Sequence, residues 1–420
     1  MKREILRIRG GRPLFGRTEI RGAKNAVLPM LAASLLTPEP VTVQNCPFIT
    51  DVDDMVCVLR ALGADIERRG RDITVSGSPS LTEIPPHLAC AMRSSVFMLG
   101  ALLAERGEVR LFTPGGCRIG ARPLDIHLDG FMRMGAKVEF AEDHILCHAE
   151  KLRGAEIVLR YPSVGATENL VMAAVKAEGI TRIIGAAREP EIVSLVRLLR
   201  KMGAEISGEG TPLVTVCGTG ALDGATVTPV PDRIVAGTVM AAVAVCGGRV
   251  ELSGADSSSM GAVISPFLGA HTFLVEHGGS MTFESDGMLS STDVCTGPYP
   301  LFPTDMQAPF MACQCYASGM STMRETVFED RFSHVGELVK MGAKIALAGN
   351  TAFVDGSAGM HGAELRAADL RGGAGLVVAA LGAEGESSVS GVRYIDRGYE
   401  NIEETFRNLG GNISLESVTV

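Results

Sequence analysis

Residues 50–66 read T-D-V-D-D-M-V-C-V-L-R-A-L-G-A-D-I, and they contain the pattern that organises the whole chain. The apolar residues of the first half follow the spacing of one helix face: Val52, Met55, Val56 and Leu59. This spacing predicts an α-helix with one buried side. Thr50 is the expected N-cap, with acidic residues in the first turn. Gly63 is the expected end of the helix, because glycine accepts the left-handed conformation there, and an alternating strand follows.

The same helix, glycine and strand signature recurs along the chain, at intervals of roughly 70 residues, which is the length of a supersecondary repeat. Its copies are L-G-A-D-I (62–66), M-G-A-K-V (134–138), M-G-A-E-I (202–206), H-G-G-S-M (277–281), M-G-A-K-I (341–345) and L-G-G-N-I (409–413). The sequence therefore predicts an α/β protein built from six repeats. Each repeat is expected to contain a helix, a strand, a second helix and two strands.

A second helix, rich in Ala and Gly, is predicted before each copy of the signature. These helices begin within G-A-K-N-A-V-L-P (22–29), A-M-R-S-S-V-F-M (91–98), S-V-G-A-T-E-N-L (163–170), P-D-R-I-V-A-G-T (231–238), F-P-T-D-M-Q-A-P (302–309) and D-L-R-G-G-A-G-L (369–376). Six repeats suit either one solenoid or two groups of three, and the length of 420 residues favours two domains. The segment G-A-T-V-T-P-V-P (224–231) is the best candidate for a crossing between them.

Composition limits the class of function. The formal net charge is -9 and there is no lysine-rich run, which argues against nucleic-acid binding. The N-terminus does not read as a signal peptide, and no apolar run has the length of a membrane span. The ten cysteines are scattered, which fits the reducing cytoplasm rather than a disulfide framework. We therefore expect a cytoplasmic protein without a membrane partner.

Charged and polar residues gather at equivalent places in the repeats. At the starts of the Ala- and Gly-rich helices they are Lys24, Asn25, Arg93, Ser163, Asp232, Arg233, Asp305 and Arg371. In the turns before the other helices they are Cys117, Arg118, Arg122, Arg188, Glu189, Glu191, Glu329, Arg331, Asp396 and Arg397. Helix N-termini bind anions, so converging termini with these cations predict a multiply anionic, phosphorylated substrate. The alternative is that the arginines only cap turns and pair with nearby acids.

Two of these residues are candidates for chemistry. Cys117 lies between glycines and arginines in P-G-G-C-R-I-G-A-R-P-L-D (114–125), where the thiol pKa should be lowered and the thiol reactive. Asp305 is the best candidate for a general base, the alternative being a helix N-cap. His144, Cys147 and His148 alternate along an expected strand, so we predict no metal site. No phosphate-binding P-loop or dinucleotide fingerprint is present, and no cofactor is expected.

These motifs together resemble a known family. G-A-K-N-A, P-G-G-C-x-I-G-A-R-P-x-D, S-V-G-A-T, A-A-R-E-P-E-I-V, P-D-R-I, F-P-T-D-M-Q-A, E-T-V-F-E-x-R-F-x-H-V-x-E-L and I-D-R-G-Y-E occur in order along the chain. They resemble the UDP-N-acetylglucosamine 1-carboxyvinyltransferases, enolpyruvyl transferases of peptidoglycan synthesis that belong to the EPSP synthase-like superfamily. The resemblance implies a two-domain inside-out α/β barrel of six βαβαββ-like units, three per domain. It places residues 22–230 in one domain and residues 1–21 with 231–420 in the other, with the active site in the cleft between them.

The resemblance also implies a reaction. The 3′-hydroxyl of UDP-N-acetylglucosamine would add to C2 of phosphoenolpyruvate, and phosphate would then leave, in the first committed step of cell wall synthesis. Asp305 matches the base, and Cys117 matches the thiol that protonates C3 and is alkylated by fosfomycin. The residues that match the phosphoenolpyruvate clamp are Lys24, Arg122 and Arg397, with Asn25 beside it. The residues that match the UDP-sugar contacts are Arg93, Arg122, Pro123, Leu124, Asp125, Ile126, Ser163, Val164, Gly165 and Val327. Arg331 is a further candidate for substrate binding, and Arg371 matches an active-site arginine.

Three positions depart from the family pattern. Val235 follows P-D-R-I where Glu is common, Tyr394 precedes I-D-R-G-Y-E where many members have His, and Tyr161 stands where some members have Lys. They bear on the UDP-sugar contacts and on a neighbour of Arg397. Two rival functions are that of the sister enzyme, which makes 5-enolpyruvylshikimate 3-phosphate, and that of a catalytically silent paralogue, which binds the UDP-sugar and regulates the pathway. The first lacks the Cys117 loop, and intact catalytic motifs argue against the second.

Overall fold

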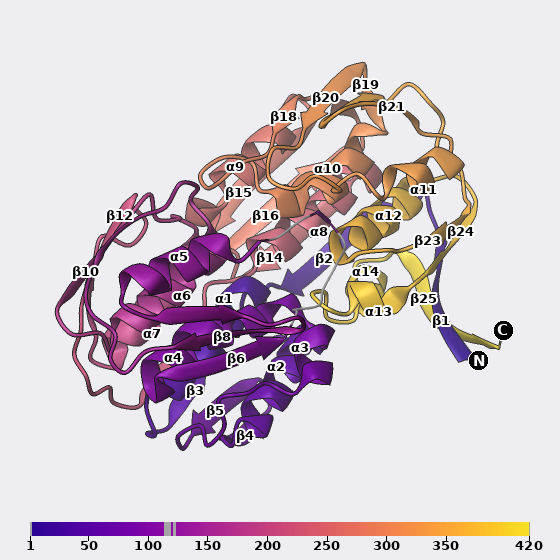
Figure 1. The fold of residues 1–420 in the computed structure, drawn as a ribbon. Coiled ribbons are helices and arrows are strands. Elements are labelled where there is room, and N and C mark those ends of the chain that lie inside the picture. Colours follow the sequence, from indigo (N-terminus) through magenta and orange to yellow (C-terminus); the bar gives the residue numbers. More distant parts are fainter. Residues whose placement is uncertain (1, 113–118, 121–122, 420) are drawn as a thin grey trace. The chain divides into compact units, whose positions relative to one another are not determined.

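A computed structural model describes residues 2–112, 119–120 and 123–419 of the chain (Figure 1). The described residues form two compact units. The first comprises residues 2–21 and 231–419 together with Ile119 and Gly120, and the second comprises 22–112 and 123–230. Ile119 groups with the first unit because its carbonyl accepts a hydrogen bond from Asp330 N at 3.1 Å. The buried apolar residues likewise form two separate clusters, so each unit has a core of its own.

In the second unit, the described strands form three sheets. Their strand orders are β13 (Ala225–Val227), β3 (Val41–Val43), β5 (Asp72–Ser76), β4 (Asp65–Arg69); then β6 (Glu108–Phe112), β8 (His144–His148), β7 (Lys137–Phe140); then β11 (Glu205–Ser207), β12 (Leu213–Cys217), β10 (Ile180–Ile184), β9 (Glu156–Val158). The first and third sheets each combine one parallel pair with antiparallel neighbours. The second sheet is antiparallel and receives one parallel bridge between Glu83 and Arg110.

The first unit repeats this topology. Its larger sheets have the orders β15 (Thr272–His277), β16 (Ser280–Ser285), β14 (Gly248–Ser253), β2 (Leu14–Glu19); then β18 (Val294–Cys295), β20 (Met320–Arg324), β22 (Thr351–Asp355), β21 (Lys344–Ala348); then β23 (Glu364–Arg366), β24 (Glu386–Ser390), β1 (Lys2–Arg9), β25 (Asn412–Thr419). A short sheet joins β17 (Leu289–Ser290) to β19 (Ala317–Ser318). Because β1 lies between β24 and β25, the two ends of the chain share one sheet (Figure 1).

The helices divide between the same two units. The second unit contains α1 (Lys24–Ala33), α2 (Thr50–Ala61), α3 (Pro86–Ala91), α4 (Met98–Arg106), α5 (Asp125–Arg133), α6 (Val164–Ala174), α7 (Pro190–Lys201) and the 3-10 turns η1 (Ser34–Leu36) and η2 (Arg93–Phe97). The first unit contains α8 (Arg233–Cys246), α9 (Gly261–Ile264), α10 (Gln307–Gln314), α11 (Val335–Lys340), α12 (Leu370–Gly382), α13 (Val392–Ile395), α14 (Ile402–Asn408), η3 (Ser257–Ser259), η4 (Ser265–Phe267) and η5 (Thr304–Met306). Among the helices that the structure describes, none is long and apolar enough to span a membrane.

Most of the local predictions are confirmed. All six Ala- and Gly-rich segments contain helices, namely α1, α4, α6, α8, α10 and α12. Five of the predicted glycines follow a helix with positive φ: Gly63, Gly135, Gly203, Gly342 and Gly410, at 95°, 93°, 100°, 94° and 95°. Each helix is therefore stopped by the left-handed conformation that glycine adopts without strain.

Two local predictions are wrong. H-G-G-S-M (277–281) does not end a helix; Gly278 and Gly279 form the turn between β15 and β16. The corresponding segment is L-G-A-H-T-F (268–273), which follows η4 and leads into β15. Thr50 is not an N-cap, because it already belongs to α2, and Ile49 precedes the helix without a side-chain cap.

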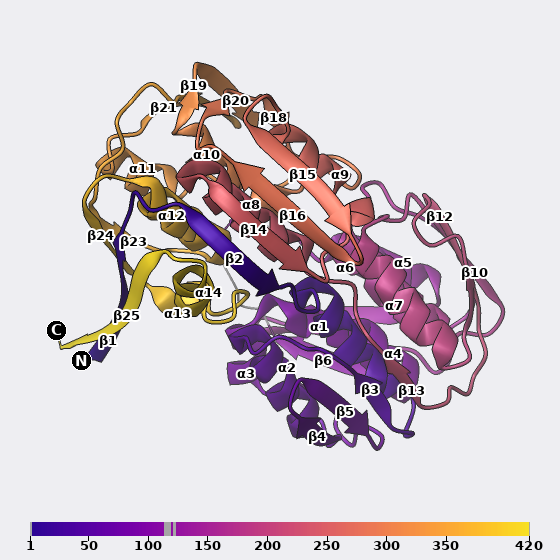
Figure 2. The same cartoon turned by 180° about the vertical axis from the view of Figure 1, so that it is seen from behind.

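The central helices of the first unit pack closely through glycine. Helices α8, α10 and α12 contact one another, and α8 also lies against β14 and β16 (Figure 2). A Cβ atom on Gly375 of α12 would lie 2.8 Å from the carbonyl oxygen of Ala308 in α10. The backbones of α10 and α12 thus approach too closely for any side chain at this position.

We expect Gly375→Ala to lower the free energy of unfolding of the first unit by about 1–3 kcal/mol, because the added methyl group forces the two helices apart. The control is Gly336→Ala in α11, where a Cβ atom meets nothing within 4 Å. This change should raise stability by about 0.5–1 kcal/mol, since alanine favours the helix. Urea unfolding of both variants measures the difference, and equal effects would contradict the packing described above.

Candidate active site

The first unit places Asp305 between two buried arginines. Asp305 Oδ1 accepts a hydrogen bond from Arg331 Nη2 at 2.8 Å. Asp305 Oδ2 accepts from Arg371 Nε at 3.2 Å and from Arg371 Nη2 at 2.9 Å. The arginine side chains are only 4% and 2% exposed, whereas that of Asp305 is 27% exposed. The carboxylate is therefore the part of this cluster that solvent, or a substrate, can reach.

Each arginine is fixed by further contacts. Arg331 Nε and Nη2 also donate to the carbonyl oxygen of Thr304, at 3.3 and 3.2 Å. The backbone of Arg371 is held at the start of α12, where Asp369 Oδ1 accepts from Arg371 N at 3.1 Å and from Gly372 N at 2.9 Å. Burial opposes the charge of Arg371, but the carboxylates of Asp305 and Asp232 outweigh it, so the net effect is a raised pKa for the guanidinium. Arg371 is thus a permanent cation.

Other predicted residues of this unit occupy separate positions. Asp232 caps α8, because its Oδ1 accepts from Ile234 N and Val235 N at 2.9 and 3.0 Å. Val327 N donates to Glu325 Oε1 at 2.8 Å. Arg397 lies half-buried in the turn after α13.

Two of the departures from the family pattern also lie in this unit. Val235 packs partly buried against the core. Tyr394 accepts a hydrogen bond from Arg393 Nη2 at 3.2 Å.

In the second unit, Lys24 is oriented by a buried acid. Lys24 is the first residue of α1, and its Nζ lies 3.0 Å from Asp51 Oδ2. The side chain of Asp51 is 1% exposed and that of Lys24 is 13% exposed. Sequence analysis assigned Asp51 only to the first turn of α2 and missed this role. Its place beside Lys24 depends on the packing of α1 against α2, which the sequence does not show.

A second polar group connects α4, α5 and α6. Asn169 Oδ1 accepts from Gly100 N at 2.7 Å, which fixes the orientation of the amide. Its Nδ2 therefore donates, to Gly165 O at 3.2 Å and to His127 Nδ1 at 3.1 Å. Burial and the nearby charge of Arg93 lower the pKa of His127 to about 4. His127 is thus a neutral imidazole, and sequence analysis missed it although it lies two residues after Asp125.

The remaining predicted residues of the second unit line the starts of α5 and α6. Ser163 caps α6, its Oγ accepting from Ala166 N at 3.4 Å, and Val164 and Gly165 begin that helix. Asp125 begins α5 and pairs with Arg160, and this hydrogen bond lowers the pKa of its carboxyl group.

The other residues of these predicted sets are placed as follows. Pro123 is exposed, Leu124 and Ile126 are half-buried, and Asn25 follows Lys24 in α1. Tyr161 is 38% exposed. Cys117 and Arg122 lie outside the described residues.

One buried acid has no evident structural partner. Glu168 of α6 is 1% exposed, and neither of its carboxyl oxygens has a hydrogen-bond partner among the residues that the structure describes. Burial and the neighbouring carboxylates of Glu191 and Glu189 raise its pKa well above the ordinary range. Glu168 is therefore held as a neutral acid.

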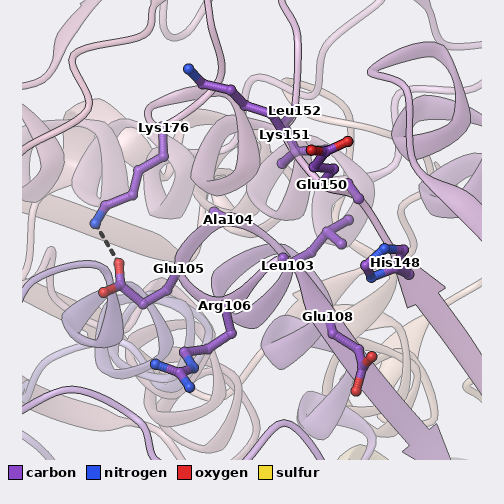
Figure 3. A pocket seen from close by; sticks show the side chains of 12 residues that line it. Leu103, Ala104, Glu105, Arg106, Glu108, His148, Glu150, Lys151, Leu152 and Lys176 are labelled. Carbon is purple, nitrogen blue, oxygen red and sulfur yellow. Dashed lines mark hydrogen bonds and ion pairs between the residues drawn. The ribbon is translucent and has the colours of Figure 1, made fainter.

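A surface pocket of about 450 Å³ lies at the end of α4 in the second unit (Figure 3). Its lining includes Arg106, Glu108, His148 and Lys151, and none of the predicted site residues. Lys176 points toward Glu105 and pairs with it (Figure 3). Lys151, another cation of the lining, pairs with Glu178.

Comparison with known proteins assigns the chain to a family. A family model described as EPSP synthase (3-phosphoshikimate 1-carboxyvinyltransferase) matches residues 8–406. The UDP-N-acetylglucosamine 1-carboxyvinyltransferase 2 of Carboxydothermus hydrogenoformans is 44% identical over 410 residues, covering 97% of this chain and 98% of the relative. The chain belongs to the family of UDP-N-acetylglucosamine 1-carboxyvinyltransferases. Relatives of that name from Nitratidesulfovibrio vulgaris and Shewanella amazonensis are 44% and 43% identical over 412 and 411 residues, covering 98% and 97% of this chain and 99% and 98% of the relatives.

Solved structures show the same fold at lower identity. The enolpyruvyl transferase NikO from Streptomyces tendae superposes with a TM-score of 0.89 at 24% identity, over 100% of both chains. EPSP synthase from Acinetobacter baumannii gives a TM-score of 0.74 at 17% identity, over 98% of this chain and 100% of the other. The protein therefore has the EPSP synthase-like, mixed α/β fold of the enolpyruvyl transferases.

His127 and Glu168 lie in the same unit and predict opposite pH effects on its stability. His127 takes up a proton near pH 6.5 when unfolded but only near pH 4 when folded, so its contribution to stability is lost as pH falls through this window. Relative to the native protein, His127→Gln should gain up to about 3 kcal/mol on acidification from about pH 7 to 4. Urea unfolding of the second unit across this range measures the gain.

Glu168→Gln is the matched comparison. The folded state holds the Glu168 proton above the pH at which the unfolded state releases it, so the native protein loses stability as pH rises past about 4.5. The variant should therefore gain stability relative to the native protein on going toward neutral pH. Parallel pH dependences of the two variants would contradict the neutral forms inferred for both side chains.

Proposed function

We propose that the chain transfers the enolpyruvyl group of phosphoenolpyruvate to the 3′-hydroxyl of UDP-N-acetylglucosamine and releases phosphate, in the cytoplasm, as a step of peptidoglycan synthesis. The observation that carries this proposal is the 44% identity, over 97% of the chain, to an enzyme named for this transfer. The position of Asp305 is consistent with it, because a reachable carboxylate is held by two buried guanidinium groups. A base fixed in this way has a defined direction toward a substrate hydroxyl.

The reaction proceeds by addition and elimination. Asp305 takes the proton of the 3′-hydroxyl while the oxygen of that hydroxyl bonds to C2 of phosphoenolpyruvate. Cys117 supplies a proton to C3. Loss of a proton from C3 and of phosphate from C2 then restores the double bond and leaves the enolpyruvyl ether. The base removes the proton of the hydroxyl that attacks C2, and the acid protonates the neighbouring carbon, C3. The addition therefore uses two separate groups.

Cations of the chain are proposed to bind the two anionic substrates. Lys24, Arg122 and Arg397 would hold the phosphate and carboxylate of phosphoenolpyruvate, with Asn25 beside them. The proposed contacts of the UDP-sugar are Arg93, Arg122, Pro123, Leu124, Asp125, Ile126, Ser163, Val164, Gly165 and Val327, with Arg331 and Arg371 near the base. The pairing of Lys24 with Asp51 supports this assignment, because it fixes a lysine that would otherwise sample many rotamers.

The shared topology of the sheets supports a finer description of the fold. We propose that each of the six larger sheets and its two helices form one βαβαββ-like repeat, with three repeats closing into an inside-out barrel in each of the units 22–230 and 1–21 with 231–420. Parallel pairs next to antiparallel strands recur in several of these sheets, for example at β13–β3, β14–β2 and β23–β24. Repetition of one βαβαββ-like unit along the chain would produce this recurrence.

The first test is release of phosphate from phosphoenolpyruvate, with and without UDP-N-acetylglucosamine. We expect release only with both substrates, and Asp305→Asn should slow it by at least about 10³-fold, because the amide cannot accept the proton. Binding of UDP-N-acetylglucosamine by the variant, measured by calorimetry, should remain. Binding without any release by the native protein would instead support the alternative, a silent paralogue that regulates the pathway.

Fosfomycin tests the role of Cys117. Incubation should add one molecule of the compound to the native protein and stop phosphate release, because the thiolate opens the epoxide. Cys117→Ser should show no mass increase, whereas Cys57→Ser, which changes an exposed cysteine of α2, should react like the native protein. Labelling that persists in Cys117→Ser would refute the assignment.

A further inference from the structure

Tyr399 lies next to Arg371, one of the two arginines that hold the proposed base. Its side chain is buried, at 4% exposure, in the turn that follows α13. The Cζ atom of Arg371 lies 5.4 Å from the centroid of the Tyr399 ring. A guanidinium over an aromatic face is attracted to it, and the attraction is stronger where water is excluded.

The hydroxyl of Tyr399 is anchored to α8. Its oxygen lies 2.8 Å from Thr238 Oγ1, and Thr238 Oγ1 donates its own hydrogen to the carbonyl oxygen of Ile234 at 2.8 Å. Since the threonine has only one hydroxyl hydrogen, Tyr399 must be the donor in the first of these bonds. Burial raises the pKa of Tyr399, which keeps the phenol protonated and able to donate. The ring is therefore fixed relative to the first turn of α8.

Arg371 needs such a support. One edge of its guanidinium, Nε and Nη2, donates to Asp305, and its backbone is held by Asp369. The other terminal nitrogen, Nη1, is buried, and no described residue accepts a hydrogen bond from it. The hydrogen bonds that Arg371 makes to Asp305 thus lie on one edge of the guanidinium, and the ring of Tyr399, with its centroid 5.4 Å from Cζ, is a further contact of this buried group.

We propose that Tyr399, anchored by Thr238, is a positioning residue that fixes the guanidinium of Arg371 and through it the carboxylate of Asp305. This rests on the proposed function, since it takes Asp305 as the base. The ring contacts neither substrate in this proposal. It limits the motion of the base, and small misplacements of a reacting group cost large factors in rate.

The chain offers a matched control for the test. Tyr316 lies in the same unit, is largely buried, and donates a hydrogen bond to a helix carbonyl, Ala379 O, at 2.5 Å. Its hydroxyl bonds near the C-terminal end of α12, whereas Arg371 lies at the start of that helix. Tyr399→Phe and Tyr316→Phe therefore each remove one buried tyrosine hydroxyl. Only the first of these changes removes the anchor of the ring beside Arg371.

The experiment measures kcat and both KM values of the full-length variants by phosphate release. We expect Tyr399→Phe to lower kcat about tenfold with little change in either KM, and Tyr316→Phe to leave kcat unchanged. Thr238→Val should reproduce the loss of Tyr399→Phe, and the double variant should be no slower than either single one, because both remove the same anchor. Equal kcat values for Tyr399→Phe and Tyr316→Phe would overturn the proposal.

A second measurement does not depend on catalysis. Urea midpoints of Tyr399→Phe, Arg371→Met and the double variant test whether the two side chains act together. We expect the shift of the double variant to be smaller than the sum of the single shifts, and additive shifts would overturn the proposal. A native protein that releases no phosphate would refute the proposed function instead, and the midpoints would still decide whether Tyr399 supports Arg371.

Discussion

The ion pair between Asp305 and the buried Arg371 depends on the close packing of α8, α10 and α12. These helices can approach one another only where glycine leaves room, as at Gly375 against the backbone of α10. Their N-terminal ends carry Asp232, Asp305 and Arg371, so the packing brings these charges together. A side chain at Gly375 would separate the helices and also the charges.

Burial of two guanidinium groups is costly unless anions compensate for them. Arg371 also lies at a helix N-terminus, where the helix dipole disfavours a cation. Asp305, Asp369 and Asp232 offset these costs, and Asp305 pairs directly with both arginines. The proposed base is thus also the residue that stabilises the cluster, and replacing it changes the charge balance as well as the proposed chemistry. The amide variant keeps the shape of the side chain, which alanine does not, but it removes the charge and the basicity together.

Regular local structure was predictable from the sequence, because it follows from spacing and from glycine. The apolar spacing of residues 52–59 gave a helix, and Gly63 ended it with positive φ. The same reasoning failed at His277, since two glycines after an apolar run suit a hairpin turn as well as a helix end. The prediction that Thr50 is the N-cap failed for a similar reason, because one hydroxyl side chain does not determine at which residue the helix begins.

The arrangement of the predicted site was less predictable, because local sequence patterns do not show which elements contact one another. Asp305, Arg331 and Arg371 were singled out one by one, and the structure shows that they touch. Asp51, His127 and Tyr399 were missed, since each acts through a partner far away in the sequence.

The contacts of His127 determine the charge state of this side chain. Because Asn169 donates to its Nδ1 and burial disfavours the charged form, this histidine is an uncharged link between helices. A protonated His127 would place a second cation near Arg93, and this repulsion, together with burial, keeps the pKa of the imidazole low.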